Sequence, residues 1–239
     1  MKKYLVLLAC GVLLAAAPAQ AQRKTKVKVK SDMAGTAANR LLPLFGGLSA
    51  EAAQQLMGPA FLASIDKSFP SRAEASKFFS NKGYEYINEN KPDTALYRFN
   101  LAWLLDQKNA DAYRGLGIVA SRNETPDESI SLLTQGLVLA PTNSLLLSDL
   151  GTSYLIRYQQ TKKKKDLEQA QKHLEQALAA DTTNAFAWQQ MARIQYYRED
   201  YLKAWEAVHK GRSLNVGSLD LDLISDLTAK MPDPQGMFK

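Results

Sequence analysis

Cysteine and histidine, which often serve as nucleophiles, acid–base groups or metal ligands near neutral pH, are scarce in this 239-residue chain. The sequence holds one cysteine, Cys10, and two histidines, His173 and His209, which lie among polar neighbours in regions of helical pattern. These surroundings predict that both imidazoles are solvated. The sequence contains no glycine-rich phosphate loop, no His or carboxylate cluster with metal-ligand spacing and no serine nucleophile turn. We therefore predict a protein that is not an enzyme and that uses no metal and no cofactor.

Two basic clusters offer electrostatic chemistry instead. One alternates with threonine and valine over residues 22–30, and the other is the run of four lysines at 162–165. Because like charges repel and gain nothing from packing, we expect these side chains to face water. The simplest interpretation is a solvated surface, and the alternative is attraction to an anionic lipid, a glycan or an acidic partner. The basic residues are Arg23, Lys24, Lys26, Lys28, Lys30, Lys162, Lys163, Lys164 and Lys165.

The net charge is unevenly placed along the chain. The formal charge is +6, of which Lys2 and Lys3 contribute two and the cluster at 23–30 contributes five, so the remainder sums to about −1. The part of the chain beyond residue 30 is thus close to neutral. Since no aromatic residue interleaves the basic cluster to stack on bases, nucleic acid is not an expected partner.

The amino terminus has the organisation of a secretory signal peptide. Lys2 and Lys3 form a positive head, residues 4–17 are apolar, and Ala19-Gln20-Ala21 supplies small residues for cleavage. The apolar run is too short for a comfortable membrane span. We expect an exported protein, periplasmic or secreted after cleavage following Ala21. Its mature chain then has no cysteine, and hence no disulfide and no thiol nucleophile.

A lipoprotein anchored at Cys10 is the alternative, because Leu7-Leu8-Ala9-Cys10 resembles a bacterial lipobox. The apolar segment before Cys10 is short, and residues 11–17 continue it. A lipoprotein normally turns polar directly after its cysteine. The sequence therefore favours cleavage following Ala21 over acylation.

Bulky and small residues recur at 34-residue spacing from Phe79 onward. Each series has one longer step of 41 residues, because seven extra residues fall between Gly151 and Ala170. Where two helices cross closely, a side chain larger than Gly, Ala or Ser would push their axes apart, and bulky residues fill the volume on either side. A period in this range indicates stacked helix pairs. The series are Phe79, Tyr113, Leu147 and Trp188; Gly83, Gly117, Gly151 and Ala192; Ala95, Ser129, Ala170 and Ala204; Phe99, Leu133, Leu174 and Val208; and Ala102, Gly136, Ala177 and Gly211.

These segments resemble tetratricopeptide repeats, whose pattern places a bulky residue, Gly, Tyr, Ala, Phe, Ala and Pro at set offsets. The match covers residues 76–215, and the resemblance implies an all-α, right-handed α-solenoid of about four helix pairs with capping helices at both ends. The first repeat supplies Phe79, Gly83, Tyr86, Ala95, Phe99 and Ala102. The departures are Gln107, Thr182 and Val216 at the closing proline, and Ala120 and Gln195 at the tyrosine position.

Helix start signals set the expected boundaries. Ser71 with Glu74 predicts a capping box, and the tetrapeptide at 125–128 combines a cap, a first-turn proline and an acid.

Residues 38–45, 49–57 and a stretch after Gly58-Pro59 predict short helices that cap the first repeat; the alternative is a mobile segment that touches a membrane or docks a partner. The longer step predicts either an extended helix or an outward loop around 158–166. The expected divisions are a signal peptide at 1–21, a basic flexible leader at 22–35, amino-terminal capping helices at 36–70, repeats at 71–217 (about 76–109, 110–143, 144–184 and 185–217), a carboxy-terminal capping helix at 218–230 and a loose tail at 231–239.

The resemblance also implies a concave groove, lined by the first helix of each repeat. Its arginines, amides and tyrosines suit an extended peptide, including one that bears carboxylates. The alternative is that these residues are merely the polar faces of amphipathic helices. The implied groove residues are Lys77, Asn81, Tyr84, Asn88, Arg114, Ile118, Arg122, Thr152, Gln189, Arg193, Tyr196 and Tyr197, with Ser80, Ser148 and Asp149 beside them. A chaperone-binding clamp known in some members is not expected, because Ser80, Tyr84, Gly115, Leu145 and Asp149 take the places of its Lys, Asn and Arg residues.

We therefore predict a non-enzymatic scaffold or adaptor in the bacterial cell envelope, which binds a protein or an extended peptide in this groove. The alternative is an envelope-surface protein that binds anionic lipid or glycan through the basic residues at 23–30 and 162–165. Salt dependence distinguishes the two hypotheses, because attraction by exposed lysines fades as ionic strength rises.

Overall fold

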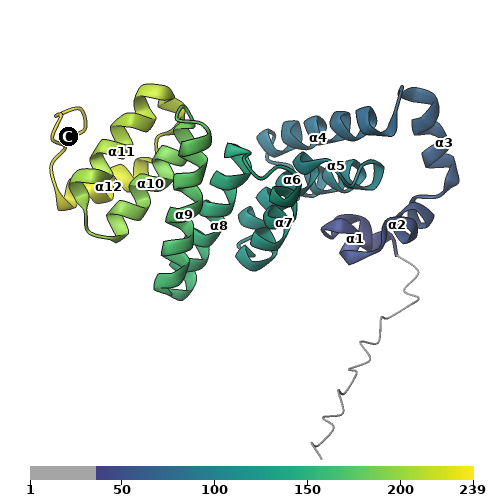
Figure 1. Cartoon of the computed structure of the whole chain (residues 1–239), viewed down its shortest axis with the longest axis horizontal. Coiled ribbons are helices and arrows are strands. Elements are labelled where there is room, and N and C mark those ends of the chain that lie inside the picture. The colour runs from purple at the N-terminus through teal and green to yellow at the C-terminus, as the bar shows by residue number, and fades with distance from the viewer. Residues whose placement is uncertain (1–35) are drawn as a thin grey trace, which may run out of the picture. The chain divides into compact units, whose positions relative to one another are not determined.

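The computed structural model describes residues 36–239, which form helices, turns and loops with no strand. The predicted signal peptide, its cleavage point after Ala21, Cys10 and the basic cluster at 23–30 lie outside the described residues. Four consecutive helix pairs stack on one another (Figure 1), which confirms the predicted all-α solenoid of helix pairs for this part of the chain. The pairs are α4 (Arg72–Asn88) with α5 (Pro92–Leu105), α6 (Ala110–Arg122) with α7 (Pro126–Leu139), α8 (Ser144–Thr161) with α9 (Lys164–Ala180), and α10 (Ala185–Tyr197) with α11 (Tyr201–Leu214).

Asparagine begins the first helix of three of these pairs. The side chains of Asn109, Asn143 and Asn184 accept hydrogen bonds from backbone N–H groups in the first turns of α6, α8 and α10. These caps satisfy donors that have no partner inside the helix. They explain why each new pair begins directly after a short turn.

Two of these asparagines also join neighbouring pairs. The amide nitrogen of Asn109 donates to the hydroxyls of Ser76 and Ser80 on α4, at 2.8 and 3.0 Å. The amide nitrogen of Asn184 donates to the hydroxyl of Ser144 on α8, at 2.9 Å. One side chain thus caps its own helix and bonds to the preceding repeat.

Two predicted caps differ in detail. Ser71 accepts from the N–H of Glu74 at 3.2 Å, which forms one half of the expected capping box. The side chain of Thr125 accepts no hydrogen bond from the first turn of α7, so the expected cap is not formed. Its hydroxyl donates instead to the carbonyl of Ala120 at 2.9 Å, in the last turn of α6, where carbonyls lose their partners within the helix.

The close helix crossings depend on glycines, as the spacing predicts. The ring of Phe99 is enclosed between Gly83 of α4 and Gly115 of α6, and a Cβ at Gly83 would lie 2.6 Å from the ring. A Cβ at Gly115 would lie closer still. Gly117 has the same relation to Leu133, at 2.6 Å. Since atoms this close repel, a larger residue would force the helices apart.

The seven extra residues of the third pair lengthen both of its helices. α8 has 18 residues and α9 has 17, compared with 13 and 14 in α6 and α7. Lys162 and Lys163 are the whole connection between them, and Lys162 takes a left-handed conformation with φ of 57°. The extension of α8 was one of the two predicted outcomes, and the outward loop is wrong. Lys164 and Lys165 belong to the first turn of α9.

Short helices before the repeats cover the outer side of the first pair. Asn100 of α5 donates to the carbonyls of Arg40 and Leu42, at 3.0 and 2.8 Å. The buried ring of Phe45 lies against Trp103 of α5, with 6.3 Å between ring centroids. Apolar surface of the first pair is thereby shielded from water. The elements are η1 (Ala37–Leu41), α1 (Leu44–Gly47), α2 (Ala50–Met57) and α3 (Pro59–Ser68).

The predicted continuous helix at 38–45 is wrong. The chain forms η1, leaves the helical conformation at Leu42 and Pro43, and then makes the single turn α1. Leu44, Phe45 and the two following glycines all have positive φ, between 50° and 77°. Pro43 disfavours a helical residue before it, which explains the break.

The carboxy-terminal region continues through η2 (Val216–Ser218) and α12 (Leu221–Lys230). Asp220 caps α12, and Leu223, Ile224 and Leu227 are buried with the apolar residues of α11. The expected loose tail at 231–239 is wrong, because Asp233 is buried and the segment packs on α11. The same contacts correct the expectation that His209 is solvated, since its side chain is 9% exposed. His173 is partly covered by Tyr154, whose ring stacks on it at 5.5 Å.

We expect Gly115→Ala to lower the free energy of unfolding by about 1–3 kcal/mol, because the added Cβ overlaps the ring of Phe99. At an unconstrained helical site the same change raises stability by roughly 0.5–1 kcal/mol. The sign of the change in urea unfolding therefore tests the packing argument. The control is Gly115→Ala in a Phe99→Leu background, where the loss should be smaller. A more stable Gly115→Ala protein would contradict the argument.

Candidate functional site

A hollow of about 430 Å³ opens on the face formed by the first helices of the pairs, and we call it the central hollow. α4, α6 and α8 supply most of its wall, and the first turn of α10 supplies Phe186. These helices lie against one another in chain order, so residues from successive repeats meet there. Among the predicted groove residues, those on the wall are Tyr84, Asn88, Arg114, Ile118, Arg122 and Thr152.

A buried ion pair crosses the floor of the central hollow. The Nε of Arg114 on α6 donates to a carboxylate oxygen of Asp149 on α8 at 2.6 Å, and the two side chains are 17% and 14% exposed. The guanidinium lies over the ring of Tyr84 on α4, at 5.3 Å. Burial raises the pKa of Asp149 above its usual value, although the charge of Arg114 opposes this shift. Burial also raises the pKa of Tyr84. The charge of Arg114 is thus balanced inside the fold.

Two large apolar side chains stand exposed at one end of the hollow. Leu145 is 48% exposed and Phe186 is 40% exposed, and both lie on its wall. The groove residues inferred from the sequence omitted both. Both lie in the first turn of their helices, at the repeat position that Lys77 occupies in α4, so the repeat offset alone contained the signal. This end of the hollow can bury an apolar group.

Polar groups lie where α4 and α6 end. Arg122 is exposed and donates from Nη1 to the carbonyl of Ile87 at 3.1 Å. Asn88 is exposed beside it on the wall. The central hollow therefore combines an apolar end with an end that offers a cation and an amide.

Three predicted groove residues have other surroundings. Lys77 and Asn81 are exposed on α4 but do not line the central hollow. Gln189 is not a groove residue, because it is 1% exposed and its Nε2 donates to the carbonyl of Val208 at 3.1 Å. Gly211 leaves room for this amide against α11, and a Cβ there would overlap it. Gln189 is therefore part of the contact between α10 and α11.

The remaining predicted residues of α10 face partners within the fold. Arg193 forms an ion pair with Asp220, the cap of α12, which ties the fourth pair to the terminal helix. The hydroxyl of Tyr197 accepts a hydrogen bond from Gln159 at 2.8 Å. The ring of Tyr196 lies 5.9 Å from that of Tyr201. These side chains are partly buried, and they do not form the wall of the central hollow.

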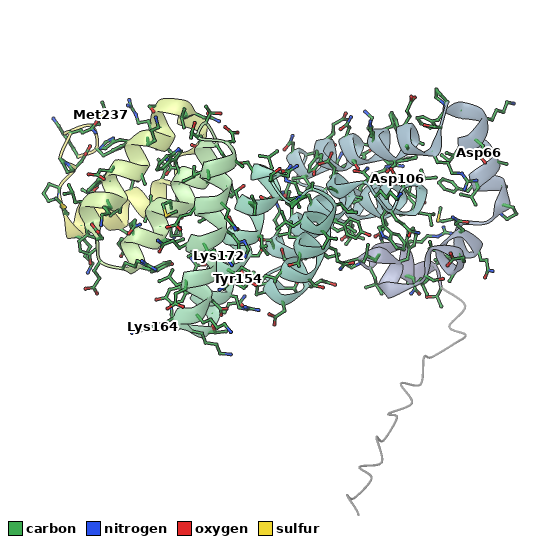
Figure 2. The ribbon with its side chains drawn as sticks, viewed as in Figure 1. Asp66, Asp106, Tyr154, Lys164, Lys172 and Met237 are labelled. Atoms are coloured by element: carbon green, nitrogen blue, oxygen red, sulfur yellow. The ribbon has the colours of Figure 1, made fainter. Side chains whose placement is uncertain are left out.

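Two lysines of the run, Lys163 and Lys165, line a second hollow, of about 770 Å³, between the second and third pairs. All four lysines are exposed, as expected, and Figure 2 shows Lys164 at the end of the α8–α9 hairpin. Arg157 bridges Asp127 and Asp166 across this hollow, at 2.7 and 2.6 Å. The charged wall residues are Glu124, Asp127, Glu128 and Asp166 against Arg157, Lys163 and Lys165. The wall is therefore not a basic surface.

Residues 36–239 contain no helix that is both long enough and apolar enough to cross a membrane. Within the same residues, no three or more His, Cys, Asp or Glu side chains gather in a way that could hold a metal ion. The expected absence of metal, cofactor and enzymatic activity stays a prediction.

We expect Arg114→Met to lower the free energy of unfolding by about 3 kcal/mol at neutral pH, because it leaves the carboxylate of Asp149 buried without its partner. The raised pKa of Asp149 then rises further, and the folded state binds more protons than the unfolded chain. The deficit should therefore be largest above the raised pKa and shrink as the pH falls toward the ordinary pKa of the unfolded carboxyl. Urea unfolding across the acidic range measures this effect. The control is Arg114→Met/Asp149→Leu, which removes the carboxylate and should therefore lose the dependence on pH. If the loss of unfolding free energy in Arg114→Met is the same at every pH, Asp149 is not a buried charge in that variant.

Known proteins share this architecture. No family model and no curated protein matches the sequence. The crystal structure of TTC0263, a thermophilic TPR protein in Thermus thermophilus, superposes with a TM-score of 0.56 at 17% identity, over 67% of this chain and 94% of that one. MamA from position 41 to its end, from Desulfovibrio magneticus RS-1, gives a TM-score of 0.50 at 17% identity, over 70% of this chain and 89% of that one. The chain therefore has the tetratricopeptide-repeat fold that its sequence pattern implied.

Proposed function

We propose that this protein is a non-enzymatic scaffold that holds an extended segment of another protein in the central hollow. The tetratricopeptide-repeat fold supports a role in protein interaction in general. The observation that carries the proposal is the pair Leu145 and Phe186, which stand exposed on the wall of a hollow. Exposed apolar side chains that gather at a concave site are typical of binding surfaces, whereas single ones are common everywhere.

The charges of the hollow favour a segment with few carboxylates. Arg114 is paired with Asp149, and Arg193 with Asp220, so neither offers a free charge to a ligand. Arg122 keeps an exposed guanidinium at the polar end. The segment that fits best places an apolar or aromatic side chain against Phe186 and one acidic group near Arg122. This class of partner is more restricted than the extended peptide, including one that bears carboxylates, that the sequence suggested.

The test replaces the two exposed apolar side chains at one end of the hollow. Phe186→Ser with Leu145→Ser should weaken partner binding by at least about tenfold, because burying one large apolar side chain contributes about 1.5–3 kcal/mol. A photo-crosslinking residue at Thr152, on the wall of the hollow, traps the bound segment in cells. Mass spectrometry then identifies the crosslinked peptide, and its affinity is measured with purified protein.

The matched control is Leu202→Ser, which removes a side chain that is 51% exposed on α11, away from the hollow. Binding should be unchanged in this variant. Equal losses in the control and the groove variant would show that the partner binds elsewhere. Binding that depends on residues 162–165 and fades with salt would favour the surface hypothesis. The mixed charges around the lysine run weaken that second hypothesis.

We also propose that the protein acts in the bacterial cell envelope after export. The support is the positive head, apolar stretch and Ala19-Gln20-Ala21 site at the amino terminus. Protein recovered from the envelope fraction should begin at Gln22 when its mass is measured. Ala19→Arg with Ala21→Arg should block this cleavage, because the small residues are lost. A mature protein that begins at a lipid-modified Cys10 would establish the anchored alternative instead.

A further inference from the structure

The segment 231–239 lies against one stripe of α11, formed by Trp205, His209 and Arg212. Their spacing places these three side chains on one face of the helix. The Nε1 of Trp205 donates to the carbonyl of Met231 at 3.0 Å. A nitrogen of Arg212 lies 3.2 Å from the sulfur of Met237, which Figure 2 shows within this segment. The segment contains no helix or strand, so side-chain anchors hold it on α11.

Asp233 is the first anchor. Its side chain is 0% exposed, and one carboxylate oxygen lies 2.7 Å from Nε2 of His209. The backbone N–H groups of Gln235, Met237 and Phe238 donate to the same carboxylate, at 2.9, 2.8 and 3.0 Å. Burial would raise the pKa of Asp233, but these donors lower it to about 2. The carboxylate therefore folds the segment into a turn and ties that turn to α11.

Phe238 is the second anchor. Its ring stacks on Trp205 with 5.8 Å between centroids and 18° between planes, and on His209 with 5.9 Å and 24°. Pro234 and Gln235, which lie between the two anchors, are exposed. Asp233 and Phe238 thus supply the contacts of the segment with His209, and Phe238 also stacks on Trp205.

We infer that the Trp205–His209 face of α11 is a peptide-docking site, separate from the central hollow, that recognises an aspartate-capped turn followed by an aromatic side chain. The occupant is residues 231–239 of the same chain. The Nδ1 of His209 is buried and bonds to no group among residues 36–239, so this occupant leaves one polar atom of the site unsatisfied. An unsatisfied buried polar atom weakens the hold of the segment on its site.

The experiment uses the full chain and a fluorescein-labelled synthetic peptide of residues 231–239. We expect the peptide to bind the Phe238→Ala protein, and to bind the wild type at least about tenfold more weakly, because the attached segment competes at a high effective concentration. Peptides that carry Asp233→Asn or Phe238→Ala should lose binding. Fluorescence polarisation measures all four cases.

Several results would overturn the inference. The absence of peptide binding to both Phe238→Ala and Asp233→Ala proteins, each shown by circular dichroism to be folded, would mean that the segment is a fixed part of the core. Equal binding to wild type and Phe238→Ala would place the peptide elsewhere. A wild type that is dimeric where Phe238→Ala is monomeric would show exchange of the segment between two copies. Phe186→Ser should leave peptide binding unchanged, so the outcome is independent of the central hollow.

Discussion

This structure depends on one constraint: some neighbouring helices pack so closely that only glycine fits where they touch. Phe99 fills the space between Gly83 and Gly115, so one ring joins both helices of a pair to the first helix of the next. Leu133 packs against Gly117 in the second pair as Phe99 packs against Gly83 in the first. Helices held at this distance place α4, α6 and α8 side by side, and these three helices line most of the central hollow.

Much of the fold could be predicted because its main contacts repeat. Close helix crossings recur along the repeats, and each one shows in the sequence as a Gly, Ala or Ser at the repeat spacing. Predictions failed where a residue depends on one distant partner. His209 was predicted to be solvated because Glu206, Lys210 and Arg212 lie near it in the sequence, yet Asp233 and Phe238 cover it. The residues around His209 do not record these two partners.

The candidate site could likewise be predicted only in part. The repeat offset brought Tyr84, Arg114 and Thr152 to one wall, since helices of equal register present equivalent positions. Whether a residue there is open to a ligand depends on the helices packed against it. Asp149 of the next repeat neutralises Arg114, and Gly211, on the second helix of the same repeat, leaves room for Gln189 to be buried. A position on the groove face is thus predictable from one helix, whereas its availability for binding depends on that helix's neighbours.

The contacts between successive helix pairs, which we call joints, differ in chemistry. Asn109 and Asn184 hold the first and third joints with neutral hydrogen bonds to serine hydroxyls. At the middle joint Asn143 faces a repeat with Ala110 and Arg114 at the corresponding positions, and the pairs Arg114–Asp149 and Arg157–Asp127 cross it. Dissolved ions screen attraction between charges, more strongly for the exposed pair than for the buried one, and act little on neutral bonds. Rising ionic strength should therefore weaken the charged contacts of the middle joint, beneath the hollow, and leave its buried neutral hydrogen bond between Ser129 and Ser153, at 2.8 Å, unchanged. The ion pair of Arg193 with Asp220 makes the contact of the fourth pair with α12 sensitive to salt in the same way.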